Sequence, residues 1–130
     1  MGSKVPVVRA LTAQAQVVYK IMPREIWEDA LQNSTFFGSP DDLRDGFIHF
    51  SQGHQVASTL EKHFHGQTDL VLIAVPTATL GDALRWERSR GGDTFPHLYA
   101  SLPTSSAVWS RTIDLDANGV PKCDPAWLTC

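Results

Sequence analysis

One run of residues limits the possible folds of this 130-residue chain more than any other feature. Residues 70 to 74 are consecutively apolar, within the sequence DLVLIAVP that ends at Pro76. A strand with one face in water alternates apolar and polar residues, whereas a continuous apolar run is typical of a strand buried on both faces. We therefore expect a central strand here, with other elements packed on both of its sides.

The rest of the chain predicts helices mainly in its first half and strands mainly in its second half. Helices are expected over residues 23–33, in a short turn that begins with the capping-box sequence SPDD at 39–42, and over 52–65. Further strands are expected over residues 17–21, 46–51, 83–89, 97–100 and 107–115. Helices and strands do not alternate one for one, so the pattern predicts an α+β fold with a mixed or antiparallel sheet and flanking helices.

Length and composition are typical of one globular domain. The chain is 42% hydrophobic and 19% charged, which is enough apolar material for a core without disulfide bonds. We expect a loose N-terminal lead over residues 1–16, a single domain over 17–117 and an irregular C-terminal tail over 118–130. The tail holds both cysteines, Cys123 and Cys130, which we expect to be reduced.

Charge and hydropathy exclude some classes of partner. The formal net charge of −3 gives no general attraction to nucleic acid or to an anionic membrane surface. No segment approaches the roughly 20 apolar residues of a membrane-spanning helix. The N-terminal sequence also lacks the layout of a signal peptide, so we expect a cytoplasmic protein without a membrane partner. The overall charge does not favour a nucleic-acid partner, but a local basic pocket leaves that alternative open.

Strand alternation sorts the residues of GFIHFS, 46–51, onto two faces. Ile48 and Phe50 fall on one face, which is plain core, while Phe47, His49 and Ser51 fall on the other. An imidazole next to a hydroxyl is typical of a site that binds ribose hydroxyls or the edge of a phosphate group.

The sequence HLYA, 97–100, repeats this layout. His97 and Tyr99 fall on one face of the predicted strand, and Leu98 and Ala100 fall on the other. Either histidine alone could simply satisfy buried backbone groups. Their matching arrangement favours a shared polar site.

A third polar segment, WERSRGG over residues 86–92, precedes HLYA. Its guanidinium groups, on Arg88 and Arg90, have the geometry for bidentate phosphate binding, and its two glycines allow close approach of a ligand. The alternative is that the arginines pair with Glu87 and Asp93 at an exposed strand end. The chain contains neither a GxGxxG nor a GxxxxGK[ST] nucleotide motif.

Other catalytic and metal motifs are missing from the sequence. There is no HExxH, no CxxC and no GxSxG. His63 and His65 are two residues apart and diverge around a helix, so they cannot share a metal ion. We expect no metal cofactor.

Several segments together resemble a known family. In order along the chain they are VYKI, a first helix containing Trp27, FGSPDDLRDGFIHFS, a helix ending HFHG, DLVLIAV, LRWERSRGGDTFPHLYASLP and a closing strand with a Val-Trp pair. Over residues 17–115 the chain resembles the uncharacterised bacterial family DUF952. The resemblance implies a fold like that of ADP-ribosyltransferases, in which a split mixed or antiparallel sheet with helices around it forms a cleft.

The same resemblance implies a ligand and roles for the candidate residues. In transferases of this type the cleft binds NAD, so His49 and Ser51 are expected to contact ribose. Arg88 and Arg90 are expected to hold phosphate, as arginines do in the related RNA 2′-phosphotransferases.

The aromatic candidates are assigned in the same way. His97 is expected to act with His49 as a catalytic residue, and His97 or Tyr99 is expected to contact the nicotinamide portion. Tyr99, joined by Trp86 if it faces the cleft, is expected to stack on a base or on nicotinamide.

One departure from the transferase pattern leaves the activity open. Many ADP-ribosyltransferases carry a glutamate on a late strand, but the last predicted strand, AVWSRTIDL, has none. The hypotheses are therefore an NAD-using transferase, a non-catalytic binder of a nucleotide-like small molecule, and a protein-interaction domain without a ligand. The sequence does not determine the substrate, the acceptor or the oligomeric state.

Overall fold

The computed structural model describes residues 15–89 and 91–128. The predicted N-terminal lead therefore lies almost wholly outside the described residues. The α-helices of the described residues are α2 (Arg24–Asn33), α3 (Pro40–Asp45) and α4 (Val56–His63), and each is three turns long or shorter. The strands are β1 (Val17–Pro23), β2 (Thr35–Phe36), β3 (Ile48–His49), β4 (Leu70–Pro76), β5 (Leu84–Arg88), β6 (Thr94–Leu98), β7 (Leu102–Pro103), β8 (Trp109–Leu115) and β9 (Pro121–Lys122).

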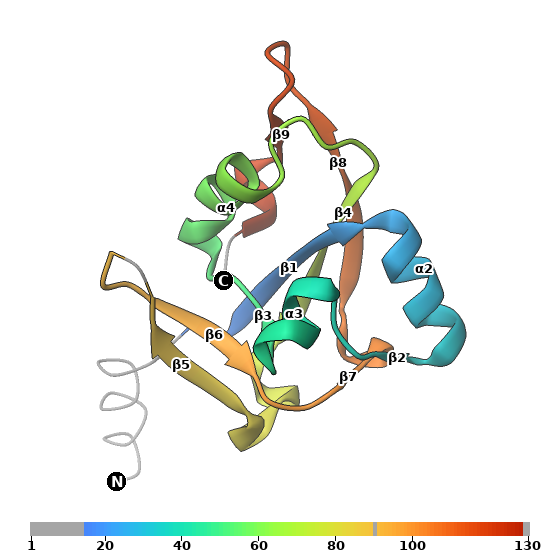
Figure 1. The fold of residues 1–130 in the computed structure, drawn as a ribbon, viewed down its shortest axis with the longest axis vertical. Helices are drawn as coiled ribbons and strands as arrows, with labels where there is room; N and C mark the ends of the chain where they lie inside the picture. The colour runs from blue at the N-terminus through green and yellow to red at the C-terminus, as the bar shows by residue number, and fades with distance from the viewer. Residues whose placement is uncertain (1–14, 90, 129–130) are drawn as a thin grey trace, which may run out of the picture.

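The described strands form three sheets. A four-stranded sheet has the order β1-β4-β8-β9, a three-stranded sheet has the order β3-β6-β5, and β2 pairs with β7. The described strand pairings are antiparallel throughout. The predicted α+β class with antiparallel sheet is confirmed (Figure 1).

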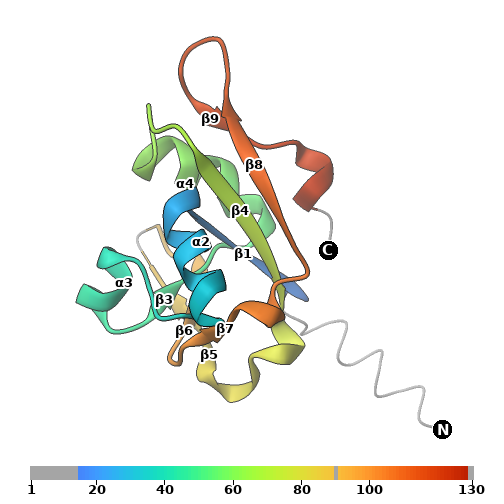
Figure 2. The ribbon, with the colours of Figure 1, turned by 90° about the vertical axis from the view of Figure 1, so that its right-hand side faces the viewer.

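Strand β4 lies between β1 and β8, and elements cover both of its faces (Figure 2). On one face Val71, Ile73 and Val75 belong to a core that includes residues of α2 and of the three-stranded sheet. On the other face Leu72 and Ala74 belong to a second core, with residues of α4 and of the C-terminal segment. Coverage of both faces explains why the run of apolar residues is uninterrupted.

The chain segment 48–51 joins the two larger sheets. Ile48 and His49 pair with β6. Farther along the chain, the backbone of Ser51 exchanges two hydrogen bonds, of 2.9 and 2.8 Å, with that of Tyr19 in β1. Strand β1 is the edge strand of its own sheet, so the two sheets meet here and diverge on either side. The divergence creates the space in which the candidate site lies.

Helix α3 begins with the predicted capping box. The Ser39 hydroxyl accepts a hydrogen bond from the backbone amide of Asp42, and the Asp42 carboxylate accepts one from the backbone amide of Ser39. Pro40 occupies the first turn, and Gly46 ends the helix at φ 88°, in the left-handed region that favours glycine. These local signals place Asp42 in the first turn of α3, the helix that precedes β3 in the chain.

Several predicted elements differ from the structure. The strand expected over 46–51 is reduced to β3, because the chain leaves β6 after His49 to reach β1. The strand expected over 97–100 begins at Thr94 and ends at Leu98. The tail expected to be irregular contains β9 and a 3₁₀ turn, Pro125–Leu128, because its apolar side chains Trp127 and Leu128 pack on the core beside α4.

The helices among the described residues are all too short or too polar to cross a lipid bilayer.

Candidate functional site

A cleft of about 840 Å³ lies where the two larger sheets diverge. Its walls come from β1, α3, α4 and the β3–β6 pair. A cleft of this size is within the range of sites that bind small molecules and cofactors. His49 and His97 both line it, at positions that lie directly opposite each other in the β3–β6 register.

The imidazole of His49 is held by two aspartates of α3. Its Nδ1 lies 2.6 Å from Oδ1 of Asp42, and its Nε2 lies 3.0 Å from Oδ2 of Asp45. The backbone amide of His49 also donates to Oδ1 of Asp42 at 3.0 Å. The ring is thus fixed in position, while 35% of the side chain remains exposed.

Asp42 in turn holds a buried lysine. Nζ of Lys20, from β1, lies 3.0 and 2.9 Å from the two carboxylate oxygens, and the side chains of Lys20 and Asp42 are only 8% and 1% exposed. Burial lowers the pKa of Lys20, against the opposing effect of the Asp42 charge.

The pKa of Asp42 shifts in the direction that keeps it charged. Burial raises the pKa, but this effect is outweighed by the hydrogen bond from His49, the charge of Lys20 and the backbone donors of Ser39 and His49, which hold the pKa well below its ordinary value. Asp42 is therefore ionised at neutral pH.

His97 belongs to a second, more exposed network. Its Nδ1 lies 2.7 Å from Oε1 of Glu87, and the hydroxyl of Tyr99 donates to the same oxygen at 2.7 Å. The hydrogen bonds from Tyr99 and His97 lower the pKa of Glu87, and the bond to Glu87 raises that of Tyr99. Arg85, whose guanidinium lies 5.1 Å from the centre of the Tyr99 ring, adds a positive charge to this second network.

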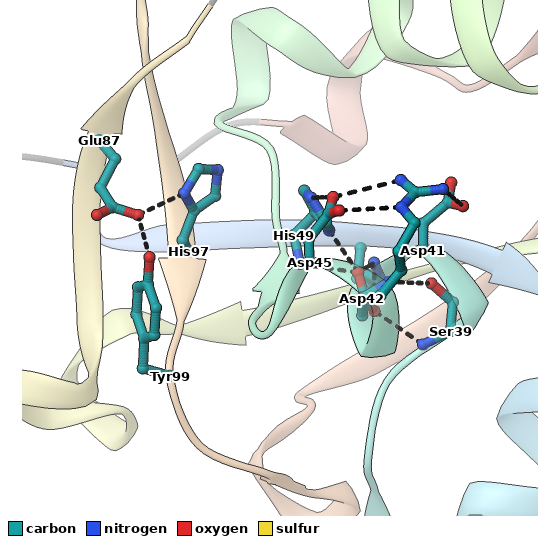
Figure 3. A network of polar contacts seen from close by, with 10 residues as sticks. Ser39, Asp41, Asp42, Asp45, His49, Glu87, His97 and Tyr99 are labelled. Carbon is teal, nitrogen blue, oxygen red and sulfur yellow. Dashed lines mark hydrogen bonds and ion pairs between the residues drawn. The ribbon is translucent and has the colours of Figure 1, made fainter.

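The two networks lie side by side (Figure 3). The ring centres of His49 and His97 are 5.6 Å apart and meet edge to face. Phe47 contacts both rings, stacking on His97 at 4.1 Å and tilted against His49 at 4.5 Å. The two imidazoles, which the sequence predicted to share a polar site, lie together in the cleft, and each is paired with a carboxylate that the sequence did not assign to it.

The other predicted site residues are distributed unevenly. Ser51 lines the cleft, with its hydroxyl 3.3 Å from that of Thr59. Tyr99 lies beside Phe47 rather than in the cleft wall. Trp86 packs against the core, because it lies opposite the buried Pro96 in the β5–β6 register and so on the face away from His97.

Of the two arginines predicted to bind phosphate, the one that the structure describes, Arg88, does not lie in the cleft. Nη1 of Arg88 lies 3.3 Å from the backbone carbonyl of Gly92, within its own loop, and Arg88 does not line the cleft. Arg90 lies outside the described residues. The cations that do line the cleft are Lys20, Arg44 and Lys62, and the first two are paired with aspartates.

Among the described residues, no group of three or more histidine, cysteine or carboxylate side chains is arranged to hold a metal ion.

Sequence reasoning missed several residues of the site, among them Lys20, Asp42 and Glu87. The capping box identified Asp42 as a helix cap, and its position seven residues before His49 gave no signal of a contact. Glu87 and Trp86 are neighbours in β5 and point to opposite faces of the sheet. Only the register between β5 and β6 shows that Glu87 lies on the same face as His97. A lysine within the otherwise apolar strand VVYKI was the one visible signal of a buried ion pair.

Comparison with known proteins places the chain in a family. A family model described as "Protein of unknown function (DUF952)" matches residues 21–110. The crystal structure of protein CC0527 from Caulobacter crescentus is 49% identical, with a TM-score of 0.80 over 82% of this chain and 93% of that chain.

A solution NMR structure of CC0527 agrees, at 48% identity and a TM-score of 0.76 over 83% of this chain and 93% of that chain. No protein with a curated description matches. With the matched region spanning most of its length, the chain belongs to the DUF952 family of proteins of unknown function.

Proposed function

We propose that the cleft binds a ribose-phosphate compound, with NAD as the first candidate, and that the divergent sheets correspond to the split sheet of ADP-ribosyltransferases. The observation that carries the proposal is the pair His49 and His97, 5.6 Å apart in a cleft of about 840 Å³. Imidazole nitrogens and the nearby hydroxyl of Ser51 suit the hydroxyl groups of a ribose.

The charge of the cleft indicates where the phosphate would lie. Lys20 and Arg44 are neutralised by aspartates, whereas Lys62 has no acidic partner among the described residues and lines the cleft from the last turn of α4. We therefore assign the phosphate contact to Lys62 instead of Arg88, while the phosphate role of Arg90 stays a prediction. An unpaired ammonium group at the edge of a cleft attracts phosphate as a point charge.

A thermal-shift titration with NAD, ADP-ribose and inorganic phosphate tests the binding. A ligand at about 100 times its dissociation constant adds roughly 2.7 kcal/mol of stability, which raises the melting temperature by on the order of 10 °C for a domain of this size. His49→Ala should abolish the shift. His54→Ala is the matched control, because His54 is exposed and does not line the cleft.

A second pair of variants tests the phosphate contact. Lys62→Ala should weaken the binding of ADP-ribose but not that of adenosine, whereas Lys122→Ala, which changes an exposed lysine on β9, should weaken neither. The absence of a shift with all three ligands, under conditions where the wild type melts cooperatively, would contradict the proposal.

If NAD binds, its fate separates a transferase from a simple binder. A transferase releases nicotinamide from NAD over hours, and this release can be followed by chromatography. Bound but intact NAD would identify the protein as a non-catalytic nucleotide binder.

A further inference from the structure

The two histidines of the cleft differ in the number of ring nitrogens that face a carboxylate. Both nitrogens of His49 do so, at 2.6 Å from Asp42 and 3.0 Å from Asp45. A ring nitrogen that faces an ionised carboxylate at such a distance is occupied by it and is not open to a ligand. Neither ring nitrogen of His49 is therefore open to a ligand in the cleft.

The two aspartates are ionised at neutral pH. The pKa of Asp42 is held well below its ordinary value, and hydrogen bonding from Arg44 lowers that of Asp45. The charged groups that face His49 are these two aspartates from α3 and, through Asp42, Lys20 from β1. His97 faces it from β6.

Only one nitrogen of His97 faces a carboxylate. Nδ1 lies 2.7 Å from Glu87, and Nε2 has no hydrogen-bond partner among the described residues. Among the described residues, every fully buried side-chain nitrogen or oxygen has a hydrogen-bond partner. Because Nε2 of His97 has none, it is not fully buried and contacts the solvent in the cleft. When Nδ1 donates a proton to Glu87, Nε2 is the ring nitrogen left open toward the cleft.

The groups around His97 support this arrangement. Glu87 is held by a second donor, the hydroxyl of Tyr99, so its carboxylate oxygen stays in place for Nδ1. The other charged groups that face His97 are Arg85, its register partner on β5, and His49 on β3.

We propose that His97 is the proton acceptor of the cleft, acting through Nε2, that Glu87 and Tyr99 position it, and that His49, held at both nitrogens by Asp42 and Asp45, is not the acceptor. The inference rests on the proposed function in that it assumes a reactive ligand in the cleft. The step is the transfer of a proton from a hydroxyl group or water to Nε2. The O–H bond breaks, an N–H bond forms, and the oxygen keeps the electron pair and becomes the nucleophile.

Chemical modification of the unliganded protein separates the two roles. Diethyl pyrocarbonate acylates an imidazole only through an unprotonated nitrogen. Exposure alone predicts faster modification of His49, whose side chain is 35% exposed against 12% for His97. The proposal predicts the reverse order, with His97 modified about tenfold faster or more, as measured by peptide mass spectrometry.

Three results would overturn the assignment. They are equal rates at the two histidines, faster modification of His49, and failure of His97 to react while the exposed His54 is modified. None of these depends on ligand binding, so the assignment fails or stands separately from the proposed function.

Nitrogen-15 NMR of the histidine rings gives an independent test of the positioning role. The wild type should show the tautomer of His97 in which Nδ1, and not Nε2, carries the proton. Glu87→Ala should shift His97 toward the tautomer protonated at Nε2. Asp93→Asn, which removes the carboxylate partner of His54, should leave the signals of His97 unchanged. An unchanged tautomer in Glu87→Ala would show that Glu87 does not position the ring.

Discussion

The two histidine–carboxylate pairs of this cleft use the same side-chain chemistry at very different depths. The Asp42 side chain is 1% exposed and joins Lys20, His49 and the cap of α3 in one network. The Glu87 side chain is 38% exposed, and its hydrogen-bond partners among the described residues are His97 and Tyr99. A buried carboxylate with several partners supports the fold itself, whereas an exposed one can orient a ring at little cost to stability.

Removal of the buried carboxylate should have the largest effect. Asp42→Ala leaves the ammonium group of Lys20 buried without its counter-charge, and breaking a buried ion pair in this way costs about 3–5 kcal/mol. Urea unfolding should measure the loss. Asp41→Ala, one residue earlier and 73% exposed, should change the free energy of unfolding by less than about 0.5 kcal/mol. Equal effects of the two substitutions would mean that Asp42 does not support the fold.

Lowering the pH should reduce the difference in free energy of unfolding between the wild type and a variant that lacks the Asp42 carboxylate. The pKa of Asp42 lies below its ordinary value in the folded protein, so its contribution is present above the unfolded-state pKa, about 4, and is lost as the pH falls through that value toward the folded-state pKa. The difference in stability between the wild type and Asp42→Asn should therefore stay constant down to about pH 4 and narrow as the pH falls further. A difference that does not narrow below about pH 4 would show that the charge of Asp42 is not what stabilises the fold.

Substitution of the exposed carboxylate should have the smallest effect on stability. Glu87→Gln should unfold at the same urea concentration as the wild type, because the side chain is largely solvated and its partners can turn to water. A substantial loss of stability would show that the β5 network supports the fold as the α3 network does.

The sequence predicted those features of the site that depend on local periodicity. The alternation of a strand is fixed by the backbone, so His49 could be assigned to the face of Ser51 and His97 to the face opposite Leu98. The capping box at Ser39 and the buried strand at residues 70–76 are local signals of the same kind, and the structure confirms both.

The parts that were missed depend on register between distant strands. Trp86 was considered as a stacking residue, but its pairing with Pro96 turns it toward the core. The same register brings Arg85 opposite His97 and Glu87 next to it, which no pattern within residues 84–88 can specify. Lys20 and Asp42 are 22 residues apart, and only the folded chain shows that they meet.

The segment from Ile48 to Ser51 has a mechanical consequence for whatever enters the cleft. One continuous piece of backbone is bonded to β6 at its start and to β1 at its end, and the Phe50 side chain between them is only 2% exposed. Separating the two sheets at this junction would break main-chain hydrogen bonds and expose the Phe50 ring to solvent. The cleft is therefore largely preformed, so a ligand is selected by its shape and little binding free energy is lost to rearrangement of the protein.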